Sequence, residues 1–223
     1  MPHRARIIQL FDSVAKAYDA WYAQPAGRVV LETEARMLGS VLPAGVGAEV
    51  GAGTCVFAQV LSRDREILCC DPSLEMLELG RERCPHVLAS TAEEPPLRPR
   101  SLDFAYLVTV IEFLEEPGLA LAQLSSLVRR GGVLAVLFIE RQSRWGRLYE
   151  EVGRRGEDPV LASARLYSFE EVEDLLRRSG LRVRRVLQAL DYEPLSVPSE
   201  EPKIYEGLSC ADCGVTLIAA EPQ

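Results

Sequence analysis

The sequence predicts an α/β fold: a doubly wound, seven-stranded, mostly parallel sheet with an antiparallel last strand and a helical cap. Apolar runs of strand length alternate with helical patterns from residue 46 to about residue 190, which is typical of a doubly wound core. These runs contain uninterrupted Val, Leu and Ile, as in strands covered on both faces. No helical pattern separates the last two runs, which is why the final strand is expected to be antiparallel.

The N-terminal segment, roughly residues 5–40, predicts two helices. Ile8, Phe11, Ala15, Tyr18 and Tyr22 recur at spacings of three and four residues, and 25–27 (Pro-Ala-Gly) interrupts the pattern. The expected strands are 46–50, 66–71, 87–90, 102–110, 132–139, 181–190 and 215–220. The expected helices after residue 50 are 54–63, 73–83, 117–130 and 169–179.

Two stretches depart from the alternation of strands and helices. Residues 141–168 predict a partly helical insertion after the fifth strand, and residues 191–212, rich in Pro, Glu and Ser, predict a long loop. Neither a repeat nor a linker interrupts the chain, so 1–223 is expected to form one domain. Residues 1–40 and 141–168 are expected to form its cap, because insertions near strand ends often line ligand sites.

Charge and hydropathy narrow the class of partner. The net charge is −8, whereas a nucleic-acid-binding face has to be basic, so no nucleic acid is expected as a partner. There is no apolar run of membrane-spanning length and no signal-peptide core, so no membrane association is expected. Several of the six cysteines lie in apolar runs, where a thiol behaves as a small hydrophobe. These features predict a cytoplasmic protein with reduced thiols.

A glycine turn is the strongest functional signal in the chain. An apolar run ends in Glu49 and Val50, a turn with Gly51 and Gly53 follows, and a helical pattern begins near Thr54. Glycines in such a turn leave room for a ligand beside the backbone, and the helix that follows directs free N–H groups toward it. Asp71 ends the next apolar run, where a carboxylate can accept hydrogen bonds from a ribose.

The details of this turn favour a cation-bearing adenosine ligand over a dinucleotide. Val56 stands where a dinucleotide fold prefers its third glycine, and Glu49 would repel a pyrophosphate. A carboxylate suits an ammonium or sulfonium group. S-adenosylmethionine carries both of these groups and an adenosine, and it is therefore the expected cofactor.

At this point the chain resembles the class I S-adenosylmethionine-dependent methyltransferases, of the small-molecule, methyltransferase-11-like branch, with their Rossmann-like fold. AEVGAGTC at 48–55 resembles the family's glycine motif, and CDPSLEML at 70–77 resembles the segment after its second strand. Residues 90–136 resemble the long third block, and YSFEEVEDLLRRSGL at 167–181 resembles the next helix and its exit. The match covers about residues 10–190.

The resemblance implies a role for each residue of the cofactor site. Asp71 is expected on the ribose, Met76 against the adenine, and Ala92 and Glu93 at the adenine edge. Thr109 and Val110 are expected to end the fourth strand beside the cofactor. The full expected set is Glu49, Gly51, Ala52, Gly53, Asp71, Pro72, Met76, Ala92, Glu93, Thr109 and Val110. The chain departs from the family at Cys55, where a third glycine is common, and this leaves the local contact with the methionine end open.

The resemblance implies methyl transfer by in-line displacement to a small-molecule acceptor, without a metal and without a nucleophilic side chain. Glu112 and Tyr18 are candidate catalytic residues, against structural alternatives for each. His3 is expected in a terminal tail, and His86 at the end of the sheet away from the site. The expected acceptor-binding residues are Tyr18, Tyr22, Phe113, Trp145 and Tyr149; Trp21 and Tyr167 are further aromatic candidates.

Three alternatives stay open at this stage. The domain could be an S-adenosylmethionine-binding module or an activator partner of another methyltransferase, without transfer activity of its own. An oxidoreductase that uses NAD is a third reading, which Val56 and Glu49 disfavour.

Cys210 and Cys213 have the spacing of half a zinc site, but no second pair accompanies them, so two unpaired cysteines at a strand entry are expected. The sequence does not identify the acceptor.

Overall fold

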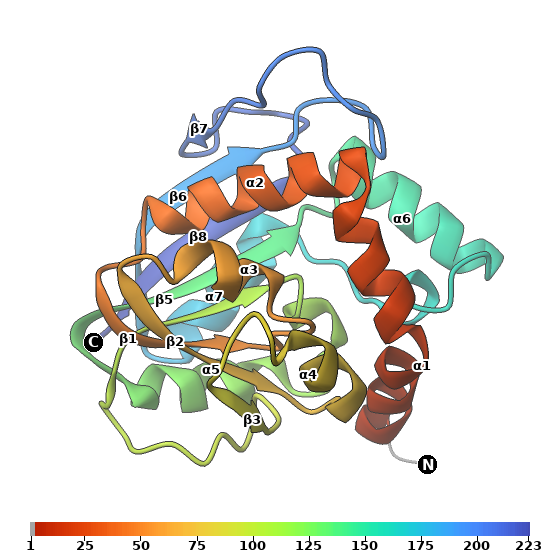
Figure 1. Cartoon of the computed structure of the whole chain (residues 1–223). Coiled ribbons are helices and arrows are strands. Elements are labelled where there is room, and N and C mark those ends of the chain that lie inside the picture. Colours follow the sequence, from red (N-terminus) through yellow and green to blue (C-terminus); the bar gives the residue numbers. More distant parts are fainter. Residues whose placement is uncertain (1–2) are drawn as a thin grey trace.

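One mixed sheet forms the centre of the protein, as seen in a computed structural model that describes residues 3–223 (Figure 1). Residues 1 and 2 of the predicted cap lie outside the described residues. The sheet has eight strands in the order β3-β2-β1-β4-β5-β8-β6-β7. The strands are β1 (Gly45–Val50), β2 (Arg65–Asp71), β3 (Val87–Ala89), β4 (Leu102–Val108), β5 (Val128–Ile139), β6 (Leu181–Ala189), β7 (Tyr205–Glu206) and β8 (Val215–Pro222).

The strand directions confirm the predicted fold class. β3, β2, β1, β4 and β5 pair in parallel, whereas β8 is antiparallel to both of its neighbours, β5 and β6. The eighth strand is β7, which was expected to be loop. It has only two residues, and it pairs with β6 through Leu187 and Gln188. β2 and β3 follow β1 on one side of the sheet, whereas β4 and β5 lie on its other side. The strand order therefore changes direction between β1 and β4, and in such sheets ligands bind at this switch point.

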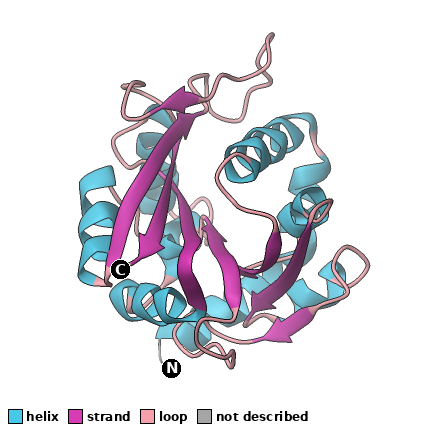
Figure 2. Cartoon of the chain, turned by 90° about the vertical axis from the view of Figure 1, so that its left-hand side faces the viewer, coloured by secondary structure: helices cyan, strands magenta, loops and turns pink. Residues whose placement is uncertain are grey.

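Helices cover both faces of the sheet (Figure 2). One core contains residues of α2 and α3 together with Phe104 and Tyr106. The other contains residues of α5 and α7 together with Ala105 and Leu107, so successive residues of β4 point to opposite faces. The helices are α1 (His3–Ala23), α2 (Pro25–Gly39), α3 (Val56–Leu61), α4 (Leu74–Gly80), α5 (Pro117–Leu127), α6 (Arg144–Arg155) and α7 (Phe169–Arg178), with short 3-10 turns η1 (Ile111–Phe113) and η2 (Leu161–Ser163).

The cap is formed by helices from two separate stretches of the chain, α1 and α2 before β1 and α6 after β5. α1 and α2 meet at a sharp corner, because Pro25 opens α2, where its missing N–H costs nothing. At this corner a Cβ on Gly27 would lie 2.1 Å from the carbonyl oxygen of Trp21, so only glycine allows the close approach. The insertion after β5 supplies α6, which Figure 1 shows beside the upper part of α1. His3 is part of α1, and the expectation that it lies in a tail is wrong.

The glycine turn between β1 and α3 shows how the chain accommodates Cys55, the position at which it departs from the family that it resembles. Cys55 has φ 59° and ψ 26°, a left-handed conformation in which a glycine is unstrained. Its side chain is fully buried and points toward α4. A Cβ on Gly80 would lie only 2.5 Å from Sγ of Cys55. The absence of a side chain at Gly80 therefore makes the room that Cys55 occupies.

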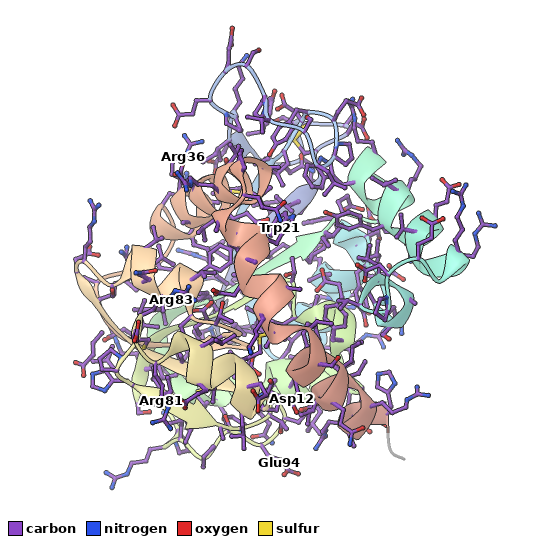
Figure 3. All side chains as sticks on the ribbon, turned by 45° about the vertical axis from the view of Figure 1, so that its right-hand side comes forward. Asp12, Trp21, Arg36, Arg81, Arg83 and Glu94 are labelled. Carbon is purple, nitrogen blue, oxygen red and sulfur yellow. A yellow bond between two sulfur atoms is a disulfide. The ribbon has the colours of Figure 1, made fainter. Side chains whose placement is uncertain are left out.

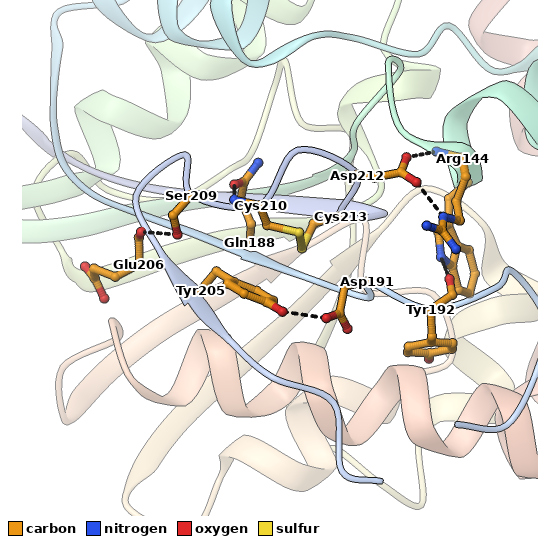
Figure 4. Close-up of a disulfide and its surroundings, with 11 residues drawn as sticks. Arg144, Gln188, Asp191, Tyr192, Tyr205, Glu206, Ser209, Cys210, Asp212 and Cys213 are labelled. Atoms are coloured by element: carbon orange, nitrogen blue, oxygen red, sulfur yellow. Dashed lines mark hydrogen bonds and ion pairs between the residues drawn. A yellow bond between two sulfur atoms is a disulfide. The ribbon is translucent and has the colours of Figure 1, made fainter. Parts of the chain in front are cut away.

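Cys210 and Cys213 form a disulfide, so the expectation that they are unpaired and reduced is wrong. The turn that leads into β8 brings their Cα atoms to 5.6 Å, which is within the usual range for a disulfide. The disulfide loop also carries Asp212, which accepts hydrogen bonds from the backbone N–H of Arg144 at 2.7 Å and from its Nε at 2.5 Å (Figure 4). The loop thereby fixes the start of α6. Cys55, Cys69, Cys70 and Cys84 are free and buried.

None of the helices in residues 3–223 is both long enough and apolar enough to cross a membrane.

The packing of Cys55 on Gly80 predicts an unequal effect of two glycine-to-alanine changes at helix C-termini. Gly80→Ala should lower the free energy of unfolding by about 1–3 kcal/mol, because the new methyl group overpacks the site. Gly39 also ends a helix, α2, and Gly39→Ala is the control. Its new Cβ would meet only Cδ2 of Leu61, at 3.8 Å. This control should be neutral or slightly stabilising. Urea denaturation of both variants measures the difference, and equal stabilities would contradict the packing argument.

The disulfide predicts the number of thiols that react in the unfolded protein. Alkylation in denaturant without reductant should modify only the four free cysteines, and alkylation after reduction should modify all six. Mass spectrometry counts the added groups. In Cys213→Ser the count should be five with or without reductant, because Cys210 loses its partner. Six modified thiols in the unreduced wild-type protein would show that the bond is absent.

Candidate active site

A large cavity opens at the carboxyl ends of the parallel strands, at the switch point between β1 and β4. Its volume is about 670 Å³, within the range of small-molecule sites in proteins. Loops that follow β1, β2, β3 and β4 line one part of it, including Gly51, Asp71, Ala92 and Thr109. Side chains of α1, α2 and α6 line much of the rest, together with residues near η1, η2 and β8. The cavity therefore joins the sheet edge to the cap.

Asp71 links two of the loops that line the cavity. Its Oδ2 accepts a hydrogen bond from the backbone N–H of Gly53, and its Oδ1 accepts one from that of Ser73, both at 2.8 Å. Each oxygen keeps a further lone pair for a ligand hydroxyl. Burial raises the pKa of Asp71 to about 6, although the two backbone N–H groups act in the opposite direction.

At the glycine turn the backbone itself lines the cavity, because Gly51 and Gly53 have no side chains. Gly51 and Gly53 have φ 71° and 52°, both in the left-handed region. A Cβ on Gly51 would lie 2.4 Å from Cγ2 of Val110, and a Cβ on Gly53 would lie 3.3 Å from Cε1 of Tyr18. Any larger residue at either position would therefore disturb the loop and the wall opposite it.

Polar contacts hold α1 over this part of the cavity. Ser73 Oγ donates to Oδ1 of Asp12 at 2.6 Å, and Arg83 donates to Oδ2 of Asp19 at 3.0 Å. Figure 3 labels Asp12 and Arg83, which both lie on the side of α1 that faces α4. Near its start, α1 also places Arg4 3.6 Å from the carboxylate of Glu93. α1 is thus attached to the loops after β2 and β3.

Nine of the eleven residues expected to bind the cofactor line the cavity. The other two, Glu49 and Ala52, do not. Glu49 is buried, and its Oε2 accepts hydrogen bonds from the hydroxyl of Tyr106 and from the backbone N–H of Ala58, both at 3.0 Å. Its side chain lies on the face of β1 that packs under α3, so it fixes the start of α3 and does not face the ligand space.

All five residues expected to bind the acceptor line the cavity, and so does Trp21. Tyr18 and Tyr22 are edge-to-face with ring centroids 5.2 Å apart, and their hydroxyls are 3.3 Å apart. Trp145 and Tyr149 form a second edge-to-face pair, at 5.9 Å. Burial raises the pKa of the Tyr18 hydroxyl far above its usual range, so this side chain stays neutral at physiological pH.

Two other candidates, Tyr167 and Glu112, lie outside the cavity lining, and so does His86, which was expected away from the site. Tyr167 is buried in the core beside α7, and His86 is exposed, 3.9 Å from Glu66. Glu112 lies behind the cavity wall, where its Oε1 accepts a hydrogen bond from the backbone N–H of Ile139 at 2.9 Å. Its Oε2 is buried without a partner among the described residues, and burial raises its pKa to about 7. None of the three lines the cavity.

The position of α6 depends on the disulfide loop and on β8. Nε1 of Trp145 donates to the backbone oxygen of Tyr192 at 3.0 Å. A Cβ on Gly214, the residue after Cys213, would lie 2.5 Å from Cδ1 of Trp145. The indole therefore packs flat on the chain just before β8. These contacts hold the Trp145–Tyr149 pair against the cavity.

Glu34 lines the cavity and was missed by the sequence prediction. It lies on α2, one turn after Val30, which lines the cavity too. Only 3% of its surface is exposed, and burial raises its pKa to about 8. In the sequence, a glutamate in an amphipathic helix resembles any solvated charge. Only the folded position of α2 distinguishes it.

The residues at the sheet edge fit S-adenosylmethionine. Asp71 offers spare lone pairs for a ribose diol, and Met76 and Ala92 offer apolar contacts for an adenine. Five carboxylates line the cavity against one basic residue, Arg4, so the site favours a ligand that carries positive charge; the carboxylates are Glu34, Asp71, Glu93, Glu115 and Asp158. A cofactor with a sulfonium and an ammonium suits this balance.

Comparisons with known proteins agree with the geometry of the site. Residues 48–136 match the family model of the methyltransferase domain. The crystal structure of a Thermotoga maritima protein, described as an S-adenosylmethionine-dependent methyltransferase and possible histamine N-methyltransferase, is 32% identical, with a TM-score of 0.88, over 97% of this chain and 100% of that one. An uncharacterised protein of Mycobacterium tuberculosis is 33% identical over 94% of this chain and 72% of its own length.

A more distant structure shares the fold alone. The cyclase SpnF is 13% identical, with a TM-score of 0.72 over 100% of this chain and 97% of the cyclase. The glycine turn after β1, the clamp formed by Asp71 and the two comparisons above 30% identity together define the family. The chain belongs to the S-adenosylmethionine-dependent methyltransferases, and S-adenosylmethionine is its cofactor.

Proposed function

We propose that the chain transfers a methyl group from S-adenosylmethionine to a small-molecule acceptor bound under its cap, in the cytoplasm. The observation that carries this proposal is the continuity of the cavity. The loops with Gly51, Gly53 and Asp71 and the aromatic cap residues Tyr18 and Trp145 line the same space. A cofactor at the sheet edge and an acceptor under the cap would therefore meet without solvent between them.

The proposed roles of the cofactor residues follow from their contacts. The carboxylate of Asp71 accepts hydrogen bonds from the ribose, Pro72 and Met76 pack on the adenine, and Glu93 lies at the adenine edge. Gly51, Gly53, Thr109 and Val110 border the methionine part. Glu49 and Ala52 support the turn from behind, since Glu49 binds Ala58 and Tyr106.

When bound, S-adenosylmethionine supplies a methyl group that its sulfonium already activates. The work of the chain is then to bind, orient and keep out water. Tyr18, Tyr22 and Phe113 form one aromatic wall of the proposed acceptor site, and Trp145 and Tyr149 form the other. Tyr18 lies against Gly53, so it borders both ligands.

The experiment that tests this function is a methylation screen with cofactor labelled in the methyl group, over amines, alcohols, thiols and carboxylates. Transfer of label to at least one class of small molecule is the expected result. Tight binding of the cofactor without transfer to any of them, together with stimulation of a second methyltransferase, would favour the activator alternative. Binding of NAD without S-adenosylmethionine would overturn the assignment.

Asp71→Ala should weaken the binding of S-adenosylhomocysteine about 10- to 100-fold, because it removes a charged hydrogen-bond acceptor worth about 1.5–3 kcal/mol. Calorimetry measures the affinity. Asp103→Ala is the matched control: Asp103 also accepts a backbone N–H, from Val46 at 2.8 Å, but at the amino end of β1. It should lower thermal stability and change the affinity less than about 2-fold. Unchanged affinity in Asp71→Ala would refute the assigned role.

The binding of S-adenosylhomocysteine should weaken at acidic pH. The pKa of Asp71 is raised to about 6, so the carboxylate that accepts the ribose hydroxyls predominates above pH 6 and is lost below it. The affinity should then fall toward about tenfold per pH unit below pH 6. Titrations from pH 5 to pH 8 measure this slope. An affinity that rises as the pH falls would contradict the assignment.

A further inference from the structure

We infer that Glu34 is the recognition residue of the acceptor site and that the acceptor is a small organic amine, whose cationic nitrogen lies between Glu34 and the aromatic residues of the cap. This inference rests on the proposed function, since it names the substrate class of the same cavity.

The first observation is that Glu34 is buried without a partner. Only 3% of its surface is exposed, and it lines the cavity. No hydrogen bond or ion pair from the described residues reaches its carboxyl group, and burial dominates its raised pKa of about 8, with the charge of Glu112 adding to it. Buried carboxylates in proteins are normally paired, because desolvation without a partner is costly. A cationic ligand would supply the missing partner.

The second observation is the aromatic surroundings of this carboxyl group. Glu34 lines the same cavity as Tyr18, Tyr22 and Tyr149. Burial raises the pKa of these tyrosines and of Tyr192, and the negative charge of Glu34 adds to the increase. Within this group, the ring of Trp145 lies 5.9 Å from that of Tyr149 and 5.7 Å from that of Tyr192. Aromatic faces attract organic cations, most strongly where water is excluded.

The third observation is the charge and the order of the residues along the cavity. Among residues 3–223, Arg4 is the only basic residue that lines it, and Arg4 is close to Glu93. No basic side chain of the cavity is therefore left for Glu34. Tyr18 touches the glycine turn at Gly53 and shares a hydroxyl contact with Tyr22. Glu34 lies on α2, a helix of the cap, and we therefore assign its carboxyl group to the acceptor side.

The same carboxyl group can hold the proton of the amine. With the proton on nitrogen, the carboxylate and the ammonium form an ion pair that binds the acceptor. With the proton on Oε of Glu34, the nitrogen keeps its lone pair. This lone pair would form the bond to the methyl carbon while the bond from that carbon to the sulfonium sulfur breaks and its electron pair goes to the sulfur. One proton moves between the nitrogen and the carboxyl oxygen, and no reactant is needed besides the amine and S-adenosylmethionine.

The test compares three probes of similar shape and different charge: 2-phenylethylamine, 2-phenylethanol and 3-phenylpropanoate. Binding to the wild-type chain saturated with S-adenosylhomocysteine is measured by calorimetry. The amine should bind at least tenfold more tightly than the alcohol, and the carboxylate should not bind. Equal binding of amine and alcohol, or preference for the carboxylate, would overturn the inference.

Variants then assign the preference to Glu34. Glu34→Gln should weaken amine binding at least tenfold and leave the affinity for S-adenosylhomocysteine within twofold, whereas Glu34→Asp should retain part of the amine preference. Glu32→Gln changes an exposed carboxylate of the same helix that does not line the cavity, and it should change amine binding less than twofold. An unchanged amine affinity in Glu34→Gln would overturn the role of Glu34.

The two proposals fail in different ways. If S-adenosylhomocysteine does not bind to the wild-type chain, the proposed function fails. If it binds but the amine is not preferred, only the inference about the acceptor fails. The melting temperature of Glu34→Gln at pH 9 gives a check on folding, and it should equal or exceed that of the wild type, because the variant removes an unpaired buried charge.

Discussion

The site depends on one carboxylate with two hydrogen bonds. Asp71 ends β2 and binds the backbone of Gly53 on one side and that of Ser73 on the other, both at 2.8 Å. Ser73 in turn donates to Asp12, so the same residue fixes the glycine turn, the start of α4 and, through one more bond, α1. A neutral side chain of the same size could not accept from both N–H groups in this way. The arrangement of the cofactor half therefore follows from the position of a single charge.

Different interactions hold the cap side of the cavity, where we propose that the acceptor binds. Its residues come from α1, α2 and α6, which are distant in the sequence, and aromatic packing and the disulfide loop hold them together. Asp212 fixes the start of α6, while Gly214 accepts the indole of Trp145. The family model of the methyltransferase domain matches residues 48–136, which include the loops after β1 to β4 but not α1, α2 or α6.

Sequence reasoning predicted the features that are local in the chain. Alternating strands and helices, the glycine turn and Asp71 follow from patterns a few residues long, and so do most cofactor residues. β7 was missed because Tyr205 and Glu206 pair with β6 without any apolar run. Glu49 and Glu112 are close in the chain to residues that line the cavity, but their side chains point into the protein interior. Glu34 was missed because its burial depends on how α2 packs, and the disulfide depends on the shape of one turn.

Cys55 and Gly80 form a single packing unit, and this has a consequence for relatives of the protein. The left-handed backbone conformation at position 55 favours glycine. The side chain of Cys55 fits there only because Gly80 of α4, which lies opposite, has no side chain. In a relative with glycine at position 55, no side chain fills this space, so position 80 does not have to be glycine. The two positions should therefore covary across the family, so that a side chain at one accompanies glycine at the other.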